Sequence, residues 1–340
     1  MIYILIDTYN LFFRVRHVAN RNATIDDQLG MCMHTMFASA NSVIKKFDAD
    51  HVVFAIEGRN NWRKKFYTPY KKTRADKLQA RSEVEAEEDA LFFETLNDTI
   101  EYIDTKTNCS LIGQDDAEAD DVIARWIDLH PDDTHIILSS DTDYYQLIAE
   151  NVSQFNGVTK ELHTIAGTLN EKGKVVIDKK TQMPKHIGRP SWLLFEKCMR
   201  GDKSDNVFSA YPGVRTKGSK NKTGLEEAFN DRTKKGFAWN NLMLQRWMDH
   251  HDKEHRVLDD YERNKILIDL RKQPQDIKDK VDLAIINAVL LNQVKAIAPN
   301  KISFGFMKFC GKHDLQKLAQ YPESIVKWIS KPYKGILADD

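Results

Sequence analysis

Acidic residues are crowded into one short stretch, GQDDAEADDVIARW, at residues 113–126. Five of the seven residues from Asp115 to Asp121 are acids, and a helical apolar pattern begins directly behind them. An acid at a helix start is often only a cap. The helix N-terminus stabilises each negative charge by about 0.3–1 kcal/mol, which offsets only part of the repulsion among several carboxylates. The stretch therefore calls for a further source of positive charge.

Further acids follow apolar runs or turn sequences elsewhere in the chain. Three of them end short apolar runs, and others lie in the sequences SSDTDYYQLI and RGDKSDNV. Carboxylates packed together would be protonated or destabilising near neutral pH, and Mg²⁺ or Mn²⁺ resolves that conflict because both ions prefer oxygen ligands. The acids exceed the need of one Mg²⁺, and paired ions suit phosphodiester hydrolysis. The candidate metal ligands are Asp7, Glu57, Glu118, Asp120, Asp121, Asp141, Asp143, Asp202 and Asp205.

A parallel sheet would bring several of these acids together. Residues 2–7, 51–57 and 134–141 are short, apolar and rich in β-branched side chains, which predicts buried strands. Helical patterns near 27–47, 83–103 and 118–129 separate them, which predicts an α/β fold with crossover helices. If the three strands are neighbours, the acids at their carboxyl ends meet at one edge of the sheet.

The helix at 118–129 separates its apolar residues from its acids. Its predicted core stripe follows helical spacing and consists of Ala119, Val122, Ile123, Trp126 and Ile127. Glu118, Asp120 and Asp121 fall in the first turn, off that stripe.

The second half of the chain has a different pattern. Residues 160–188 are polar and rich in glycine and lysine, which predicts a short hairpin or loop and a domain boundary. Helical patterns then dominate, near 191–200, 223–230, 238–250, 259–268, 281–294 and 313–329. We therefore expect two domains, at 1–188 and 189–340.

A basic segment follows the second predicted strand. Residues 63–81 hold eight lysines or arginines and one acid, whereas residues 82–89 hold five acids and no base. Such a run is usually a solvated face. Here, however, the bases alternate with Trp62, Phe66, Tyr67 and Tyr70, and basic residues with interleaved aromatic rings are typical of surfaces that bind nucleic-acid strands.

The remaining composition narrows the choice of function. Lys plus Arg and Asp plus Glu are both 50, so the net charge says nothing about partners. The four cysteines form no CxxC pair, which favours buried thiols in a reducing compartment. The sequence has no P-loop, GxSxG or HExxH motif, and no apolar run that approaches the ~20 residues of a membrane span. The N-terminal apolar run is too short for a signal peptide.

Five ordered motifs resemble those of the flap endonuclease/5′-nuclease superfamily and, within it, the branch of bacteriophage T4-type ribonucleases H. The motifs are IDTYNLFFR (6–14), VVFAIEG with NWRKKFYTPYKKTR (52–74), AEADDVIA (117–124), ILSSDTDYYQL (137–147) and GDKSDNV (201–207). The resemblance implies a PIN-like nuclease core with a central, mainly parallel sheet. It also implies a smaller helical domain with a helix–three-turn–helix DNA-binding motif near 193–230.

The resemblance also assigns roles to individual residues. The nine acids would hold two Mg²⁺ ions, with Mn²⁺ able to substitute; Glu57 departs from the family's usual aspartate. Lys71, Arg74 and Arg14 match basic positions near the scissile phosphate, and Tyr70 matches an aromatic residue that stacks at the 5′ end. The loop 210–224 is longer and more basic than the family's potassium-binding hairpin. We expect nucleic-acid contacts from Arg63, Lys64, Lys65, Tyr70, Lys72, Arg215, Lys217 and Lys220.

The implied activity is removal of RNA primers and short 5′ flaps during DNA replication, on DNA and RNA–DNA duplexes with free 5′ ends. A single-strand-binding protein or polymerase clamp is the implied partner, with no membrane. We expect a cytoplasmic monomer, in the host cell if the chain is phage-encoded. Three alternatives stay open: a PIN-type ribonuclease of single-stranded RNA, a non-catalytic nucleic-acid-binding protein on a nuclease fold, and a metal-dependent phosphatase.

Overall fold

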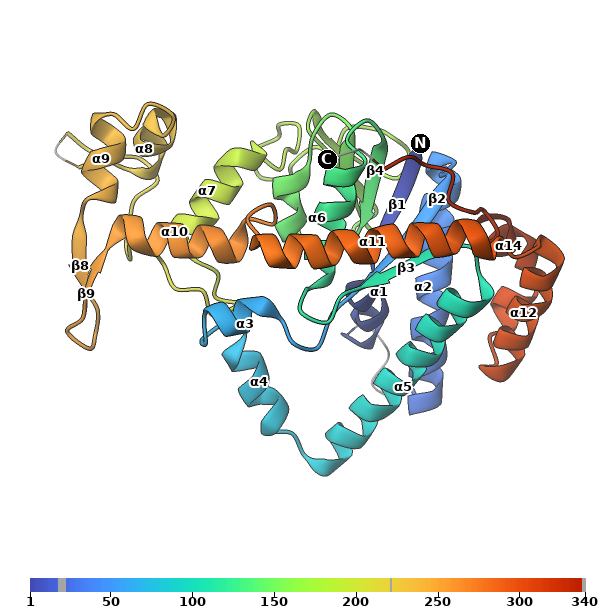
Figure 1. Ribbon diagram of the computed structural model, residues 1–340. Coiled ribbons are helices and arrows are strands. Elements are labelled where there is room, and N and C mark those ends of the chain that lie inside the picture. The colour runs from blue at the N-terminus through green and yellow to red at the C-terminus, as the bar shows by residue number, and fades with distance from the viewer. Residues whose placement is uncertain (18–22, 221, 338–340) are drawn as a thin grey trace. The chain divides into compact units, whose positions relative to one another are not determined.

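The computed structural model describes residues 1–17, 23–220 and 222–337 and contains a seven-stranded sheet flanked by helices (Figure 1). The strand order is β3-β2-β1-β4-β5-β6-β7, with β3, β2, β1, β4 and β5 parallel and the last two antiparallel. The expected mainly parallel α/β fold is confirmed. The strands are β1 (Ile2–Asp7), β2 (His51–Ile56), β3 (Ser110–Gly113), β4 (Thr134–Leu138), β5 (Val152–Asn156), β6 (Glu161–Thr164) and β7 (Gly167–Leu169).

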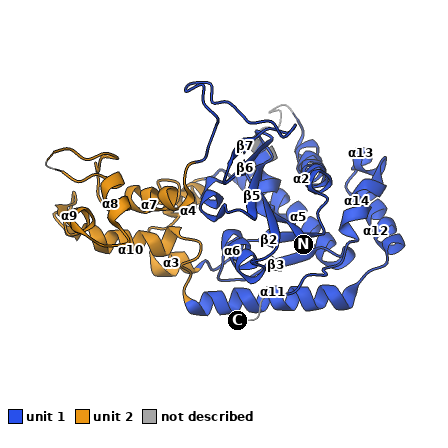
Figure 2. Ribbon diagram, turned by 90° about the horizontal axis from the view of Figure 1, so that it is seen from above, with its two compact units in different colours: residues 1–61, 81–187, 275–340 blue, residues 62–80, 188–274 orange. Residues whose placement is uncertain are grey.

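The chain forms two compact units that interleave in sequence (Figure 2). Unit 1 comprises residues 1–61, 81–187 and 275–340, and unit 2 comprises 62–80 and 188–274. This division differs from the expected boundary, which would have left 62–80 with the first domain and 275–340 with the second.

Unit 1 contains the sheet and most of the long helices. Its helices are α1 (Thr8–Phe13), α2 (Ile25–Phe47), α5 (Glu83–Lys106), α6 (Ala119–Leu129), α11 (Gln275–Lys295), α12 (Pro299–Lys312), α13 (Gln316–Ala319) and α14 (Pro322–Ile329), with 3₁₀ turns η1 (Arg14–His17) and η2 (Thr142–Leu147). Thr24 and Ser82 begin α2 and α5 with capping boxes, in which the side chain at N3 bonds back to the cap residue.

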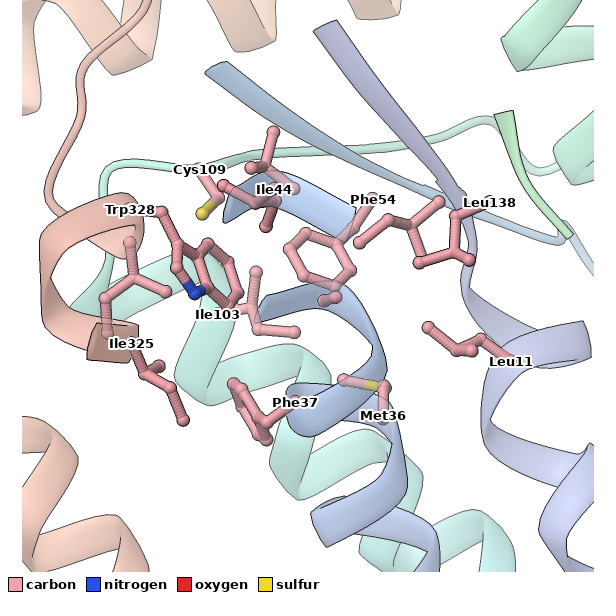
Figure 3. Packing of buried hydrophobic residues seen from close by; sticks show 14 of the residues in the cluster. Leu11, Met36, Phe37, Ile44, Phe54, Ile103, Cys109, Leu138, Ile325 and Trp328 are labelled. Carbon is pink, nitrogen blue, oxygen red and sulfur yellow. The ribbon is translucent and has the colours of Figure 1, made fainter. Parts of the chain in front are cut away.

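The two faces of the sheet are covered by different helices. Ile4 and Ile6 of β1 belong to a core cluster with residues of α2, α5, α12 and α14. Figure 3 shows part of this cluster, with Phe37 of α2, Ile103 of α5 and Trp328 of α14. Tyr3 and Leu5 alternate with them along the strand and are also fully buried. On that opposite face, α6 contacts β1 and β2, and α11 contacts β3 and α6. Burial of both faces holds the sheet edge that carries the acids in place.

Unit 2 is mainly helical. It contains α3 (Trp62–Phe66), α4 (Lys72–Gln79), α7 (Pro190–Arg200), α8 (Leu225–Asp231), α9 (Phe237–Met243), the hairpin β8 (Arg246–Met248) and β9 (Glu254–Arg256), and α10 (Val257–Ile268). Its own core includes Phe195, Met199, Phe229, Leu242 and Tyr261. The expected helix at 238–250 is wrong beyond residue 243, because Arg246–Met248 pairs with Glu254–Arg256 around a turn capped by Asp249.

Two expectations about composition can be checked against the described residues. All four cysteines are free and buried, as predicted. Within the described residues, each helix by itself is too short or too polar to span a bilayer. α11 and α12 have the required length and composition only together, and the chain bends by 109° between them.

Candidate metal-binding site

Three acids meet at the carboxyl edge of the sheet in unit 1. β1 lies between β2 and β4, so the strand ends that carry Asp7, Glu57 and Asp141 are neighbours, as predicted. The pKa of Asp7 is raised to about 7, first by burial and then by the charges of Glu57 and Asp141, against the opposing effect of its hydrogen bonds. The three carboxylates therefore act on one another electrostatically, as the metal-ligand hypothesis requires.

Asp7 is held by three hydrogen bonds. It is the N-cap of α1, where its Oδ1 accepts a bond of 3.2 Å from the backbone N–H of Asn10. Its Oδ2 accepts bonds of 3.1 Å from the hydroxyls of Ser139 and Tyr144. Asn10 in turn accepts bonds of 3.0 Å from the backbone N–H and the hydroxyl of Ser140. These contacts tie the end of β1 to the segment that follows β4.

Asp141 and Asp143 lie in the segment after β4, where the side chain of Asp141 caps the 3₁₀ turn η2. Asp141 is the N-cap of η2 and accepts a bond of 2.9 Å from the backbone N–H of Asp143. The side chain of Gln154, on β5, donates to the carbonyls of Ser139 and Asp141 at 2.9 and 2.6 Å. Asp141 therefore has the capping role that the DxD sequence allows. It is also exposed to solvent.

The acidic stretch before α6 divides into two groups. Asp115 accepts bonds from the backbone of Arg59 and the side chain of Asn60, and Asp116 forms an ion pair of 2.6 Å with Lys280. Glu118, Asp120 and Asp121 belong to the start of α6, and Glu118 and Asp121 are buried. Asp121 accepts a 3.1 Å bond from the backbone N–H of Glu118, so it caps the helix. The predicted apolar stripe of this helix is buried as expected.

The donor chemistry of this edge fits a divalent cation. The pKa of Tyr144 is raised well above its ordinary value by burial and then by the charges of Asp7, Asp120 and Asp141. The charges of Glu57 and Asp141 act on Asp7 as well, so each of these four carboxylates acts on Asp7 or on Tyr144. An all-oxygen set of like charges at a sheet edge suits Mg²⁺ or Mn²⁺.

The two remaining acids lie in unit 2, each beside a basic residue. Asp202 forms an ion pair of 2.7 Å with Lys197 and accepts bonds from the backbone and hydroxyl of Ser204. Although burial opposes the change, these partners lower the pKa of Asp202 to about 2. Asp205 accepts bonds of 2.8 Å from Arg74 and 3.0 Å from the hydroxyl of Tyr70.

Lys71 and Arg74, the basic residues expected near the scissile phosphate, both lie beside Asp205. The ammonium of Lys71 lies 4.0 Å from the Asp205 carboxylate, and its backbone N–H donates to the Asp205 carbonyl at 2.9 Å. Lys71 begins α4 with a φ of 53°, in the left-handed region that is uncommon for lysine. The side chain of Arg74 is 57% exposed, so its guanidinium remains within reach of a ligand from solvent.

Two residues expected to bind nucleic acid are buried instead. Arg63 is 1% exposed; its Nε donates to the carbonyl of Leu267 at 2.9 Å, and its guanidinium lies over the ring of Trp62. Tyr70 is 4% exposed within the core of unit 2. The expectation that both present their side chains to nucleic acid is wrong for this structure, because each satisfies its polar atoms inside the fold. Lys64, Lys65 and Lys72 are exposed.

Arg14 is half-buried in unit 1. Its Nη2 donates to the hydroxyl of Ser39 at 2.6 Å. Burial lowers the pKa of its guanidinium. A Cβ added at Gly157, in the turn between β5 and β6, would lie 2.1 Å from Nη1. The absence of a side chain at Gly157 therefore makes room for Arg14.

The basic loop between α7 and α8 presents Arg215, Lys217 and Lys220 to solvent. Glu227 of α8 closes the loop by accepting bonds of 3.0 Å from Gly218 and 2.9 Å from Gly224. Helices thus flank the loop at 190–200 and 225–231, the region where the DNA-binding motif is expected.

The sequence reasoning missed the neutral residues that orient the acids. The hydroxyls of Ser139 and Tyr144 donate to Asp7. The side chain of Asn10 accepts from the backbone of Ser140, and that of Gln154 donates to the carbonyl of Asp141. The available signal was position: Asn10 follows Asp7 by three residues, and Ser139 and Tyr144 flank the DTD sequence.

Comparison with known proteins gives one family and one fold. Residues 2–179 match the N-terminal resolvase-like domain of 5′–3′ exonucleases. The flap endonuclease of Escherichia phage T5 is 28% identical over 159 residues, covering 46% of this chain and 51% of that protein. The match thus spans about half the length of that relative.

Two solved structures are similar over a longer range. The phage T5 5′-exonuclease with bound zinc ions has a TM-score of 0.58 at 20% identity, covering 85% of this chain and 99% of that one. The T5 flap endonuclease in a pseudo-enzyme–product complex with DNA and metal ions has a TM-score of 0.55 at 19% identity, with the same coverage. At this identity the likeness establishes the shared fold.

Proposed function

This chain belongs to the 5′–3′ exonuclease family, as the motifs predicted, and we propose that it is a structure-specific 5′ nuclease that hydrolyses phosphodiesters with two divalent cations. The observation that carries the proposal is the meeting of Asp7, Glu57 and Asp141 at one sheet edge, with the pKa of Asp7 raised to about 7. Structural salt bridges do not explain two carboxylates, Glu57 and Asp141, whose charges raise the pKa of a third.

The carboxylates of unit 1 would hold the cations, which we take to be Mg²⁺, with Mn²⁺ able to replace it. Asp7, Glu57, Asp120 and Asp141 supply the oxygens. When bound, such ions would lower the pKa of water so that it loses a proton and gives a hydroxide nucleophile, and they would neutralise charge on the phosphate. Glu118, Asp121 and Asp143 are the further candidate ligands in unit 1, whereas Asp202 and Asp205, which lie in unit 2, stay predictions from the sequence.

The basic residues would compensate charge on the phosphate. Arg74 is exposed, and among the described residues its guanidinium pairs with Asp205 in an exposed contact, a class worth about 0–1 kcal/mol. It can therefore exchange Asp205 for a phosphate oxygen at little cost. Lys71 and Arg14 would contribute in the same way. Arg63 and Tyr70 are buried, so we assign them structural roles.

The proposed substrates are DNA and RNA–DNA duplexes with free 5′ ends or flaps, including RNA primers during replication. The exposed lysines at 64, 65, 72, 217 and 220 and Arg215 would contact phosphates, which position a duplex without reading its sequence. We place this activity in the cytoplasm of the cell that replicates the DNA, with a single-strand-binding protein or polymerase clamp as partner.

A cleavage assay tests this proposal. A 5′-flap duplex and an RNA-primed duplex are incubated with Mg²⁺, with and without chelator, using wild type, Asp141→Asn and Asp120→Asn. We expect metal-dependent cleavage by wild type and a loss of at least about 10²-fold in each variant. Cleavage that survives chelation or both substitutions would refute the two-cation proposal.

The same assay separates the alternatives. Tight binding of the flap duplex without cleavage would identify a binding protein on a nuclease fold. Cleavage confined to unpaired RNA would identify a single-strand ribonuclease. Hydrolysis of small phosphate esters but not of either duplex would identify a phosphatase.

A further inference from the structure

We infer that Tyr144 and Ser139 are positioning residues that occupy one oxygen of Asp7 and so present its other oxygen, alone, to a cation. The inference rests on the proposed function, because it assumes that Asp7 is a metal ligand. It concerns how this chain shapes that ligand, and neither residue carries a charge of its own.

The hydrogen bonds of Asp7 are unevenly shared between its two oxygens. Among the described residues, Oδ2 accepts from the hydroxyls of Ser139 and Tyr144, both at 3.1 Å, and Oδ1 accepts only from the Asn10 N–H at 3.2 Å. A carboxylate oxygen has about two lone-pair directions. Both directions of Oδ2 are therefore in use, whereas Oδ1 has one left.

The two donors cannot easily move away. Tyr144 is 1% exposed and Ser139 is equally buried, so neither hydroxyl has water as an alternative partner. The Ser139 hydroxyl also accepts a 3.1 Å bond from the backbone N–H of Asp141, which couples the orientation of Asp7 to that of a second candidate ligand. Gln154 fixes the backbone of the same segment through two carbonyls.

This arrangement predicts how Asp7 binds a cation. With Oδ2 occupied, Asp7 offers one atom, which suits the strict geometry and few protein ligands of Mg²⁺ better than a two-oxygen contact. Removing the Tyr144 hydroxyl would leave a direction of Oδ2 open and let the carboxylate turn. Loss of a partner that orients a ligand typically lowers metal affinity 10–100-fold.

The chain offers a matched pair of variants. Tyr144→Phe removes only the hydroxyl that bonds to Asp7. Tyr145→Phe removes the neighbouring hydroxyl, which lies 3.3 Å from the ring of His163 instead. Ser139→Ala removes the second donor and gives an independent test if Tyr144→Phe does not fold.

The primary measurement is Mn²⁺ affinity of the metal-free protein by calorimetry or by paramagnetic resonance of the bound ion. We expect Tyr144→Phe and Ser139→Ala to weaken binding about 10-fold or more and Tyr145→Phe to match wild type. A second measurement is flap cleavage against Mg²⁺ concentration. The half-saturating Mg²⁺ should rise in both variants, while the rate at saturating Mg²⁺ falls less than the affinity does.

The outcomes separate this inference from the proposed function. Unchanged Mn²⁺ affinity in folded Tyr144→Phe or Ser139→Ala, beside a wild type that binds Mn²⁺, overturns the positioning role alone. A wild type that binds no Mn²⁺ overturns the proposed function, and the inference with it. Equal losses in Tyr144→Phe and Tyr145→Phe would show a general effect on folding and also refute the positioning role.

Discussion

Arg74 is the proposed catalytic residue whose contribution to stability is easiest to separate from its contribution to cleavage. Its ion pair with Asp205 is exposed, so it contributes little to stability. We predict that Arg74→Ala changes the free energy of unfolding by less than about 1 kcal/mol but lowers flap cleavage on the order of 10²-fold. Lys77→Ala, on the same exposed helix, is the control and should retain cleavage. Equal rates in the two variants would exclude a catalytic Arg74.

Gly157 offers a test of Arg14 that does not touch the arginine itself. A methyl group at residue 157 would meet Nη1 of Arg14 at 2.1 Å, so the guanidinium must swing away and lose its bond to Ser39. We predict that Gly157→Ala and Arg14→Ala each reduce cleavage, and that the double variant is no worse than Arg14→Ala alone. Additive losses would mean that Gly157 acts independently of Arg14.

For individual residues, the sequence predicted which acids meet at the sheet edge better than it predicted how side chains are oriented. The acids at residues 7, 57 and 141 were identifiable because each ends an apolar run, and the sheet brings their strand ends together. Arg63 and Tyr70 were expected at the surface but are buried. A basic-aromatic run does not show which of its side chains will donate to an acceptor inside the fold, as Arg63 does to the carbonyl of Leu267 and Tyr70 does to the carboxylate of Asp205. The hydroxyls that hold Asp7 come from residues 132 and 137 positions away, beyond any local pattern.

Strands β2 and β4 carry buried histidines that should make folding sensitive to pH. Burial lowers the pKa of His51 and of His135 to about 4, against the opposing effect of a hydrogen bond between each ring and a backbone carbonyl. The unfolded chain therefore binds more protons than the native one below about pH 6.5, and stability is lost as pH falls from there toward 4. We predict a loss of roughly 1–2 kcal/mol per histidine between pH 7 and pH 5.

Denaturant unfolding of the metal-free protein at pH 5, 6 and 7 measures this loss. His51→Gln should make the free energy of unfolding depend less on pH. His250→Gln, in the turn after β8, is the control and should leave that dependence as it is in wild type. A wild type equally stable at pH 5 and pH 7 would contradict the assignment.

The elements that the sequence predicted best are the ones with a full face to bury. β1, β2 and β4 lie within the predicted ranges, and α2, α5, α6 and α7 begin and end within three residues of expectation. β3 consists of four residues, SLIG, and β6 and the edge strand β7 are short strands in a stretch expected as a hairpin or loop. α12 was missed because Gly305 and Gly311 interrupt its pattern, although Ile302, Phe306, Phe309 and Cys310 keep helical spacing.

The order of the two units along the chain could not be predicted from local patterns. Composition changes near residue 188, and the structure changes unit there, but the chain returns to unit 1 at residue 275. That return depends on contacts between residues far apart in sequence. Ile302 and Phe306 of α12 and Trp328 of α14 join the core built by α2, α5 and the sheet. The last 66 residues thus complete the unit that carries Asp7 and Asp141.

α12 provides a matched test of this dependence on the C-terminal segment. Phe306 is fully buried against Phe37 and Tyr102, whereas Phe304, two residues earlier, is 64% exposed. Removing a buried phenylalanine leaves a cavity, so Phe306→Ala should cost about 3–5 kcal/mol of unfolding free energy. Phe304→Ala should change it by less than about 0.5 kcal/mol. Both are measured by denaturant unfolding with cleavage assayed at a temperature where each variant is folded. Similar stabilities for the two variants would show that unit 1 folds without packing against residues 275–340. A fragment 1–274 that is folded and active would show the same. We expect neither result, because the core of unit 1 is incomplete without this segment.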